Sequence, residues 1–379
     1  MQNLKSENNR LIYYSVFAII CIPFIFYWMN LQELFSSPQS ISITSIILTV
    51  CLTTIYNRFC NNSDLFILFF CISALCLNNV IYGNIGANLT LYNIVTLLII
   101  FNNVEFSKKQ VQRIRFIMIL LLLIFLLSLN VKPVYSAILV HDMRDNKINP
   151  NTLGMLVLAV YFQGFIFIDE FIKSKFLKFI FYITITYFSM KYIYLSESRT
   201  SLISASLFII LYLIKIVNLK NYKRMLSYMI LAVLIIPFLY QIIIMSVGNI
   251  EIMGKSIFTR SLVWDSTINL IKTHPLIGCG TKADILMNPG EYTSSAHNVF
   301  LGVWKTIGIV PMITLMIYLL RGGNIKYVSP ENYLSKKAFL CCMFVCAFET
   351  MLNDSNTYLF FITLLMTIKE SETEKNNDT

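Results

Sequence analysis

The chain has 379 residues, of which 56% are hydrophobic and only 13% are charged. Soluble domains carry roughly 25% charged residues, so this composition excludes an ordinary soluble protein and places most of the chain in lipid. The formal net charge of +10 does not indicate a nucleic-acid partner, because the basic residues are spread along the chain instead of forming one patch.

Apolar segments of suitable length to cross a bilayer recur along the whole chain. A helix of about 20 apolar residues spans the hydrocarbon core, and by that criterion the sequence contains about twelve candidates. They run approximately over residues 11–29, 41–56, 65–82, 87–101, 114–131, 152–168, 176–190, 201–217, 225–245, 299–320, 338–352 and 357–368. The expected fold is therefore all-α, a polytopic membrane protein with about twelve transmembrane helices.

One polar stretch interrupts this pattern. Residues 246–296 form a large predicted loop between spans nine and ten, after a first membrane region at 1–245 and before a second at 297–368. Long loops without obvious secondary structure are usually functional or disordered, and this one is too rich in aromatic and β-branched residues to be disordered. Residues 369–379 are expected to form a polar cytoplasmic tail.

Basic residues follow every second predicted span, and this spacing predicts the orientation of the protein. Lysine and arginine gather in cytoplasmic loops, whereas the connections after the first and third spans contain neither. We therefore expect both termini in the cytoplasm and the long loop outside. The basic residues after the even-numbered spans are Arg58, Lys108, Lys109, Arg113, Arg115, Lys173, Lys175, Lys178, Lys215, Lys220, Lys223, Arg224, Arg321, Lys326, Lys336 and Lys337.

Three connections that this orientation places outside are polar or charged. They are residues 141–147, residues 196–199 and the long loop, and together with the following residue His297 they contain every histidine of the chain. Such segments are either solvated linkers tolerated despite their charge or parts of one outward-facing site. We favour a single polar site.

Helices that start on the outer face would give this site a positive character. Predicted helices begin after Asn149-Pro150-Asn151, after Arg199 and at His297-Asn298. Helix N-termini bind anions through free N–H groups and the helix dipole, and the guanidinium groups of Arg199 and Arg260 suit phosphate oxygens. The pattern predicts a phosphate-binding pocket at the lipid boundary, which a lipid-linked diphosphate would fit.

Less specific interpretations exist for several of these residues. Arg199 could simply extend to the membrane interface. Arg260 and Trp264 share one face of a short amphipathic helix ending before Pro275, and such a helix can lie in the interface without any chemistry. His274 beside Pro275 is typical of a helix end and not of a catalyst.

His297 and Lys305 are the remaining polar candidates. His297 opens a predicted helix beside the proposed anion site, where a neutral imidazole could act as a base. Lys305 lies about two turns further on, where an isolated ammonium group is costly in lipid, so we expect it either to reach the diphosphate or to pair with Glu349. No ligand cluster with a diagnostic metal spacing is present, so we predict no metal.

At these residues the chain resembles the O-antigen ligase and polymerase superfamily of polysaccharide-assembly enzymes. Ser196-Glu197-Ser198-Arg199-Thr200 resembles a signature at the outer start of a helix. Arg260, Trp264 and the run from His274 to Gly280 resemble the family's long-loop signature. His297-Asn298 followed by Gly308 resembles a third motif, and Asn149-Pro150-Asn151 is a weaker fourth. Pro311 departs from the small residue found there in many relatives.

The resemblance implies a membrane glycosyltransferase in the bacterial inner membrane, active in lipopolysaccharide biosynthesis. Its donor would be an undecaprenyl-diphosphate-linked glycan, without a nucleotide sugar, metal or other cofactor. By position, Arg199 and Arg260 would hold the diphosphate and His297 would act on the acceptor hydroxyl. Trp264, Asn298, Lys305 and Asn151 are further substrate-binding candidates. A chain-length regulator and a flippase would be partners, and no nucleic acid is expected.

Three activities remain open. A polymerase joins lipid-linked repeat units, whereas a ligase transfers the finished glycan to lipid A-core. We favour the polymerase, because such enzymes are more numerous and diverse. A polysaccharide flippase or transporter also has about twelve helices, but it usually places ionisable or broken segments near the membrane midplane, and the polar residues here collect at one surface.

Overall fold

The computed structural model describes most of the chain. The described residues are 2–29, 38–59, 62–128, 150–214, 219–247, 251–252, 255–256, 258–281, 283–288, 290–293, 295–322, 330–350 and 357–369. The predicted outer segment with His141, Asp142, Asp145 and Asn149 lies outside these residues, as does the polar tail from residue 370 onward.

The described part of the chain is mostly helical. Its helices are α1 Gln2–Met29, α2 Pro38–Phe59, α3 Asn62–Tyr82, α4 Ile85–Asn103, α5 Lys108–Ser128, α7 Pro150–Phe171, α8 Lys175–Leu195, α9 Arg199–Ile214, α10 Leu219–Val247, α11 Phe258–Thr273, α12 Val299–Ile307, α13 Ile309–Gly322, α14 Pro330–Cys346 and α15 Tyr358–Ile362. Its strands are β1 Glu105–Ser107, β2 Glu251–Ile252, β3 Lys255–Ser256, β4 Ile285–Asn288, β5 Glu291–Thr293 and β6 Thr367–Lys369.

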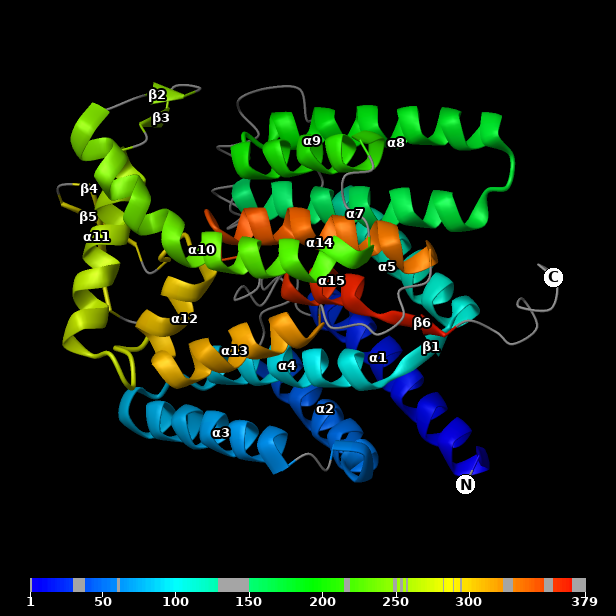
Figure 1. Cartoon of the computed structure of the whole chain (residues 1–379), viewed down its shortest axis with the longest axis horizontal. Helices are drawn as coiled ribbons and strands as arrows, with labels where there is room; N and C mark the ends of the chain where they lie inside the picture. Colours follow the sequence, from blue (N-terminus) through cyan, green and yellow to red (C-terminus); the bar gives the residue numbers. More distant parts are fainter. Residues whose placement is uncertain are drawn as a thin grey trace.

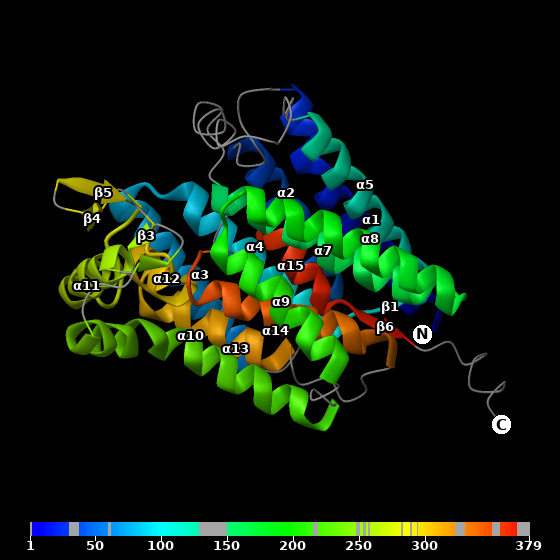
Figure 2. The same ribbon diagram turned by 90° about the horizontal axis from the view of Figure 1, so that it is seen from above.

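The helices lie in layers (Figure 1). Helices α8 and α9 form one side, α2 and α3 form the other, and α7, α14, α15, α4 and α13 fill the space between them. Helix α11 and strands β2 to β5 gather at one end of the molecule, and the β1–β6 pair lies at the opposite end, as the turned view also shows (Figure 2).

Five helices within the described residues are long and apolar enough to cross a membrane. They contain the segments Leu65–Tyr82, Ile85–Asn103, Lys108–Leu127, Asn151–Phe171 and Asn221–Ile242. Shorter apolar helices occupy Arg10–Phe26, Gln39–Ile55, Arg199–Leu213 and Ile309–Arg321. This arrangement fits a polytopic membrane protein, whereas the expected set of about twelve full spans is not confirmed.

The tenth predicted span is not one continuous helix. Gly308 has a φ of 105° and separates α12 from α13. A side chain at this position would meet the backbone carbons of Leu276 and Ile277 at 2.7 and 2.8 Å. The long loop therefore packs into the helix at Gly308, and only glycine tolerates both the positive φ and this close approach.

The last predicted span is also shorter than expected. Helix α15 has 5 residues, and a 3₁₀ turn at Thr363–Leu365 and strand β6 follow it. Strand β6 pairs in parallel with β1, with Ile368 opposite Phe106. Hydrophobicity alone suggested a span over residues 357–368, but the apolar side chains from Tyr358 to Met366 are buried inside the protein.

The long loop contains regular structure. Strands β2 and β3 pair antiparallel, helix α11 follows, and β4 and β5 form a second antiparallel pair. Helix α11 ends at Thr273, directly before His274-Pro275. A small hydrophobic core that includes Trp264 and Leu301 joins α11 to α12. The loop is thus a folded element attached to the helices.

Three basic residues that suggested a cytoplasmic loop are buried. Lys336 and Lys337 lie in α14, where Lys336 donates to Leu365 O at 3.1 Å and Lys337 to Leu211 O at 2.6 Å. Both acceptors lie near helix ends, where carbonyls lack helical partners. Arg115 forms a buried ion pair with Glu170. These charges satisfy internal polar groups, so they do not report the membrane orientation.

Candidate active site

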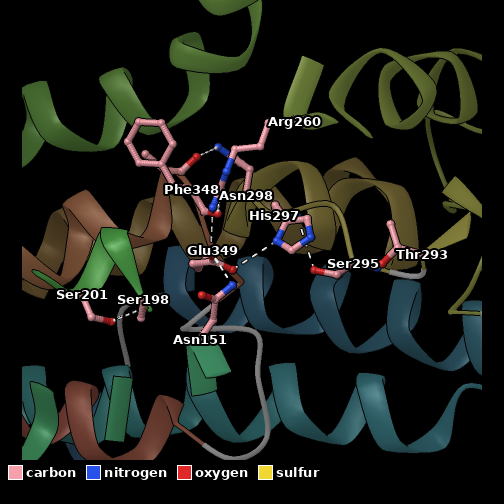
Figure 3. Close-up of polar contacts among 11 residues, drawn as sticks. Asn151, Ser198, Ser201, Arg260, Thr293, Ser295, His297, Asn298, Phe348 and Glu349 are labelled. Atoms are coloured by element: carbon pink, nitrogen blue, oxygen red, sulfur yellow. Dashed lines mark hydrogen bonds and ion pairs between the residues drawn. The ribbon is translucent and has the colours of Figure 1, made fainter. Parts of the chain in front are cut away.

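Side chains from four separate segments meet around one buried carboxylate (Figure 3). Asn151 comes from the first turn of α7, Arg260 from α11, His297 from the turn before α12, and Glu349 from the chain just after α14. We call these four residues the Glu349 cluster. They are up to 198 positions apart in sequence, so only the fold brings them together.

Glu349 is the centre of this cluster. Its Oε1 accepts hydrogen bonds from Arg260 Nη2 at 2.8 Å and from Asn151 Nδ2 at 3.1 Å, and its Oε2 lies 3.1 Å from Nδ1 of His297. Burial would raise the pKa of this carboxyl, but the His297 hydrogen bond and the positive charge of Arg260 outweigh it and lower the pKa. Glu349 is therefore a carboxylate at neutral pH.

The carboxylate determines which nitrogen of His297 is free. An ionised carboxylate can only accept hydrogen bonds, so Nδ1 of His297 must carry the proton that is shared with Glu349. In the neutral ring, Nε2 then has a lone pair. The imidazole is therefore oriented as a base, and about 22% of its side chain is exposed to solvent.

The backbone at His297 is strained. Its φ is 46°, in the left-handed region that non-glycine residues seldom adopt. Its amide donates to Ser295 Oγ at 3.3 Å, which helps to hold this turn. Strained backbone of this kind is concentrated at functional sites, and here it directs the imidazole toward Glu349.

Arg260 is held by two acceptors. Its Nη2 bonds Glu349, its Nη1 donates to the carbonyl of Phe348, and its guanidinium carbon lies 5.7 Å from the centre of the Phe348 ring. These contacts orient the planar group and, among the residues that the structure describes, leave some of its five N–H donors unused. About 22% of the side chain is exposed, so a ligand could reach it.

Arg199 starts helix α9 beside the Glu349 cluster. Its charge interacts with those of Arg260 and Glu349, and its side chain is half-buried. Two guanidinium groups and one carboxylate leave a net positive charge of about one while His297 is neutral. The structure thus brings together the three principal predicted site residues, Arg199, Arg260 and His297.

Close packing against α7 positions Arg199. Ser196 and Ser198 are buried in the turn that leads into α9, where Ser196 Oγ donates to Ile193 O at 2.7 Å and Ser198 Oγ to Ser201 Oγ at 2.8 Å. A Cβ on Gly154 of α7 would come within 2.7 Å of Ser198 Oγ. The two serines of the Ser-x-Ser-Arg motif therefore pack directly against Gly154, where a larger residue would not fit.

Asn298 caps helix α12 and joins it to neighbouring segments. Its Oδ1 accepts from the amides of Phe300 and Leu301, both at 3.0 Å, and so caps the start of α12. Its Nδ2 donates to Val233 O at 2.7 Å and Ala347 O at 3.1 Å. With these contacts Asn298 holds His297 in place, and its amide is already used within the protein.

Trp264 and Lys305 are fully buried. The Trp264 ring packs against Tyr240 at 4.9 Å and Phe348 at 6.2 Å. Lys305 Nζ donates to Ala283 O at 2.9 Å. The expected pairing of Lys305 with Glu349 is not present, because Glu349 bonds Arg260, Asn151 and His297 instead.

The run from His274 to Gly280 stabilises the break between α12 and α13. Cys279 N donates to Lys305 O at 2.7 Å, Gly280 N to Thr306 O at 3.1 Å, and Trp304 Nε1 to Pro275 O at 2.9 Å. Carbonyls at a helix end need such donors. His274 itself is exposed and its ring contacts Thr273, so this motif holds α12 and does not join the Glu349 cluster.

Sequence reasoning missed the central role of Glu349. The available signal was a lone carboxylate near the end of an apolar segment, where an ionisable group usually has a function. It also missed Gly154, because the close approach of α9 to α7 leaves no local pattern. Within the described residues no group of three or more His, Cys, Asp or Glu side chains is arranged to hold a metal ion.

Part of the chain matches a known protein family. Residues 185–316 match the family model described as O-antigen ligase, a segment from within α8 to within α13 that carries Arg199, Arg260 and His297. No curated protein and no solved structure is detectably similar to the chain. The matched segment, about a third of the chain, supports the resemblance to the O-antigen ligase and polymerase superfamily of membrane enzymes.

Proposed function

We propose that the protein is an O-antigen polymerase-type glycosyltransferase. It would join undecaprenyl-diphosphate-linked oligosaccharide repeats at the outer face of the inner membrane, with both termini in the cytoplasm. The observation that supports this most is the Glu349 cluster together with Arg199 beside it, because an oriented imidazole then lies near two arginines that can hold a diphosphate.

In the proposed reaction, the acceptor hydroxyl attacks the anomeric carbon of the donor sugar. The hydroxyl proton passes to Nε2 of His297 as the new glycosidic bond forms. The bond between the anomeric carbon and the diphosphate oxygen breaks, and the lipid diphosphate leaves with both electrons of that bond. General-base help of this kind typically contributes roughly 10²–10⁴-fold.

Charge in the cluster would change in step with this reaction. Arg199 and Arg260 stabilise the negative charge that grows on the leaving diphosphate. Protonation of His297 adds a positive charge nearby, and the carboxylate of Glu349 stabilises the resulting imidazolium. In this scheme Glu349 is a positioning residue, and Asn151 and Asn298 hold it and His297 in place.

The ligase is the alternative within the same family, and the same residues would serve it. The two differ only in the acceptor, which is lipid A-core for a ligase and a second lipid-linked repeat for a polymerase. Our preference for the polymerase rests on the greater number and diversity of such enzymes. A chain-length regulator and a flippase would be its partners.

A deletion strain analysed on lipopolysaccharide gels tests the proposal. Loss of a polymerase leaves core carrying one repeat unit, and complementation with the wild-type chain restores the ladder. Bare core with accumulated lipid-linked polymer would indicate a ligase instead. An unaltered ladder would contradict both activities, and in a host without lipopolysaccharide the capsule provides the equivalent readout.

A further inference from the structure

A pocket lies between α2, α3 and α4, on helices that contribute nothing to the Glu349 cluster. Its volume is about 450 Å³, and its lining residues include Thr49, Val50, Ile72, Cys76, Asn79 and Asn88. We call it the α2–α4 pocket. Its size falls within the usual range for small-molecule sites, about 300–1,000 Å³.

The rim of the α2–α4 pocket is apolar and exposed. Ile46 is 65% exposed, Ile85 56% and Val50 48%. Helix α3 contains the candidate membrane span Leu65–Tyr82, of which only 17% is buried within the protein. The pocket therefore opens onto an apolar surface of the kind that contacts lipid, and a ligand would enter from the membrane.

Inside the pocket, a hydrogen-bond network determines the orientation of Asn88. Asn78 Nδ2 donates to the carbonyls of Ile277 and Thr306 at 2.8 and 3.0 Å. Its Oδ1 must then face Asn88, which donates through Nδ2 at 3.3 Å. The Oδ1 of Asn88 is consequently left as an acceptor, although the residue is only 6% exposed.

Two acceptors in the pocket therefore lack donors. Within the described residues, the buried Oδ1 atoms of Asn88 and Asn79 have no hydrogen-bond partner. Other polar groups of the lining are satisfied locally, since Thr49 bonds Tyr92 at 2.8 Å and Ser45 bonds Asn93 at 2.8 Å. Buried polar atoms without partners are uncommon, and this pair indicates a ligand that supplies hydrogen-bond donors.

We propose that the α2–α4 pocket binds a neutral single-chain lipid through its hydroxyl-bearing head. The hydroxyls donate to Oδ1 of Asn88 and Asn79, near the turn between α3 and α4, and the chain lies against Val50 and Ile72. Among the described lining residues none carries a charge, so the pocket lacks the cations that a diphosphate requires. The site is thus distinct from the proposed donor site.

Cys76 lines the pocket and is exposed, so it can report occupancy. The full chain in detergent is treated with N-ethylmaleimide, and modification of each cysteine is followed by peptide mass spectrometry. The probes are 1-oleoylglycerol, which has hydroxyl donors, and methyl oleate, which has the same chain without them. Cys21 of α1 is half-buried and lies outside the pocket lining, so it serves as the internal control.

We expect 1-oleoylglycerol to protect Cys76 at a concentration about tenfold lower than methyl oleate, the equivalent of one satisfied hydrogen bond. Asn88→Leu should reduce this difference, because only Asn79 then remains as an acceptor, and each lipid should still protect Cys76 at high concentration. Asn79→Leu, which does not disturb the Asn78 network, provides a second variant if Asn88→Leu does not fold.

Three results would overturn the proposal. Equal protection by the two lipids in the wild-type protein would show that the asparagines do not recognise a hydroxyl. Unchanged modification of Cys76, or equal slowing of Cys76 and Cys21, would show that the pocket does not take up a lipid chain.

Discussion

Glu349 and His297 form a hydrogen-bonded pair, with 3.1 Å between Oε2 and Nδ1, although 52 positions separate them in sequence. The carboxylate is buried and ionised, so it fixes both the orientation and the tautomer of the imidazole. This pair gives the proposed transferase a defined base, and each element around it can be tested separately.

Glu349→Gln should lower glycan synthesis about 10²-fold or more, because the neutral amide no longer selects the productive tautomer of His297. The variant keeps the shape of the side chain, so it should still reach the membrane. The measurement is the ladder on a gel together with protein abundance. Glu197→Gln is the matched control, since Glu197 is exposed beside the site. Full activity of Glu349→Gln would remove the pair from the mechanism.

His297→Asn should abolish most product, with an expected loss of about 10²–10⁴-fold from the missing base. Asparagine tolerates left-handed backbone better than most residues, so it preserves the turn whose φ is 46°. Rates are measured with purified protein and a lipid-linked glycan. His274→Asn, at an exposed histidine outside the cluster, should retain wild-type activity, and comparable losses in both variants would contradict a special role of His297.

Arg260→Lys should reduce turnover by about 10²–10³-fold, as expected when a preorganised donor is lost from a charged transition state. A single ammonium cannot bond both Glu349 and the Phe348 carbonyl while leaving donors for a ligand. Arg199→Lys should act in the same direction. The control is Arg321→Lys in α13, where the arginine lies over Tyr318 at 5.6 Å. Wild-type turnover in either site variant would exclude that arginine from diphosphate binding.

Gly154→Ala should separate α7 from the turn that carries Arg199. The new Cβ would lie 2.7 Å from Ser198 Oγ and 2.9 Å from Ser196 Oγ, and overpacking of this kind costs typically 1–3 kcal/mol. Thermal unfolding in detergent should show a lower midpoint and reduced activity. Gly86→Ala in α4 has open space around the added methyl, so its midpoint should be unchanged or higher. Equal midpoints in the two variants would contradict the close contact.

Acid should remove the stabilisation that Glu349 provides. Its pKa is lowered from the ordinary value of 4.5, so its contribution is complete above that pH and is lost as the pH falls through the lower folded-state pKa. The difference in unfolding midpoint between wild type and Glu349→Gln should therefore be constant above about pH 5 and shrink below about pH 4. A difference that stays constant down to pH 3 would mean that charge is not the source of the effect.

Local patterns predicted residues that the fold places near one another. Arg199, Arg260 and His297 were recognised from their order and spacing, and the structure brings them to one place. The end of α11 before Pro275 also agrees with the sequence. Such features depend on residues a few positions apart, which is the range over which helix periodicity and capping act.

Contacts over long separations were not predictable. Lys336 appeared to be a loop charge, yet it is buried and bonds Leu365 O. Glu349 appeared to be a partner for Lys305, yet it joins residues from three other segments. A sequence shows that a charged group is present, but the acceptor or counter-charge that makes its burial tolerable comes from elsewhere in the fold.

The sequence by itself determined the helical membrane character of the chain and the residue types of the proposed site, because hydrophobicity and local motifs are properties of neighbouring residues. Only the tertiary structure decided the partner of His297 and the break at Gly308. Both depend on distant segments: the carboxylate after α14 orients the imidazole, and the backbone of Leu276 and Ile277 occupies the space that a side chain at position 308 would need.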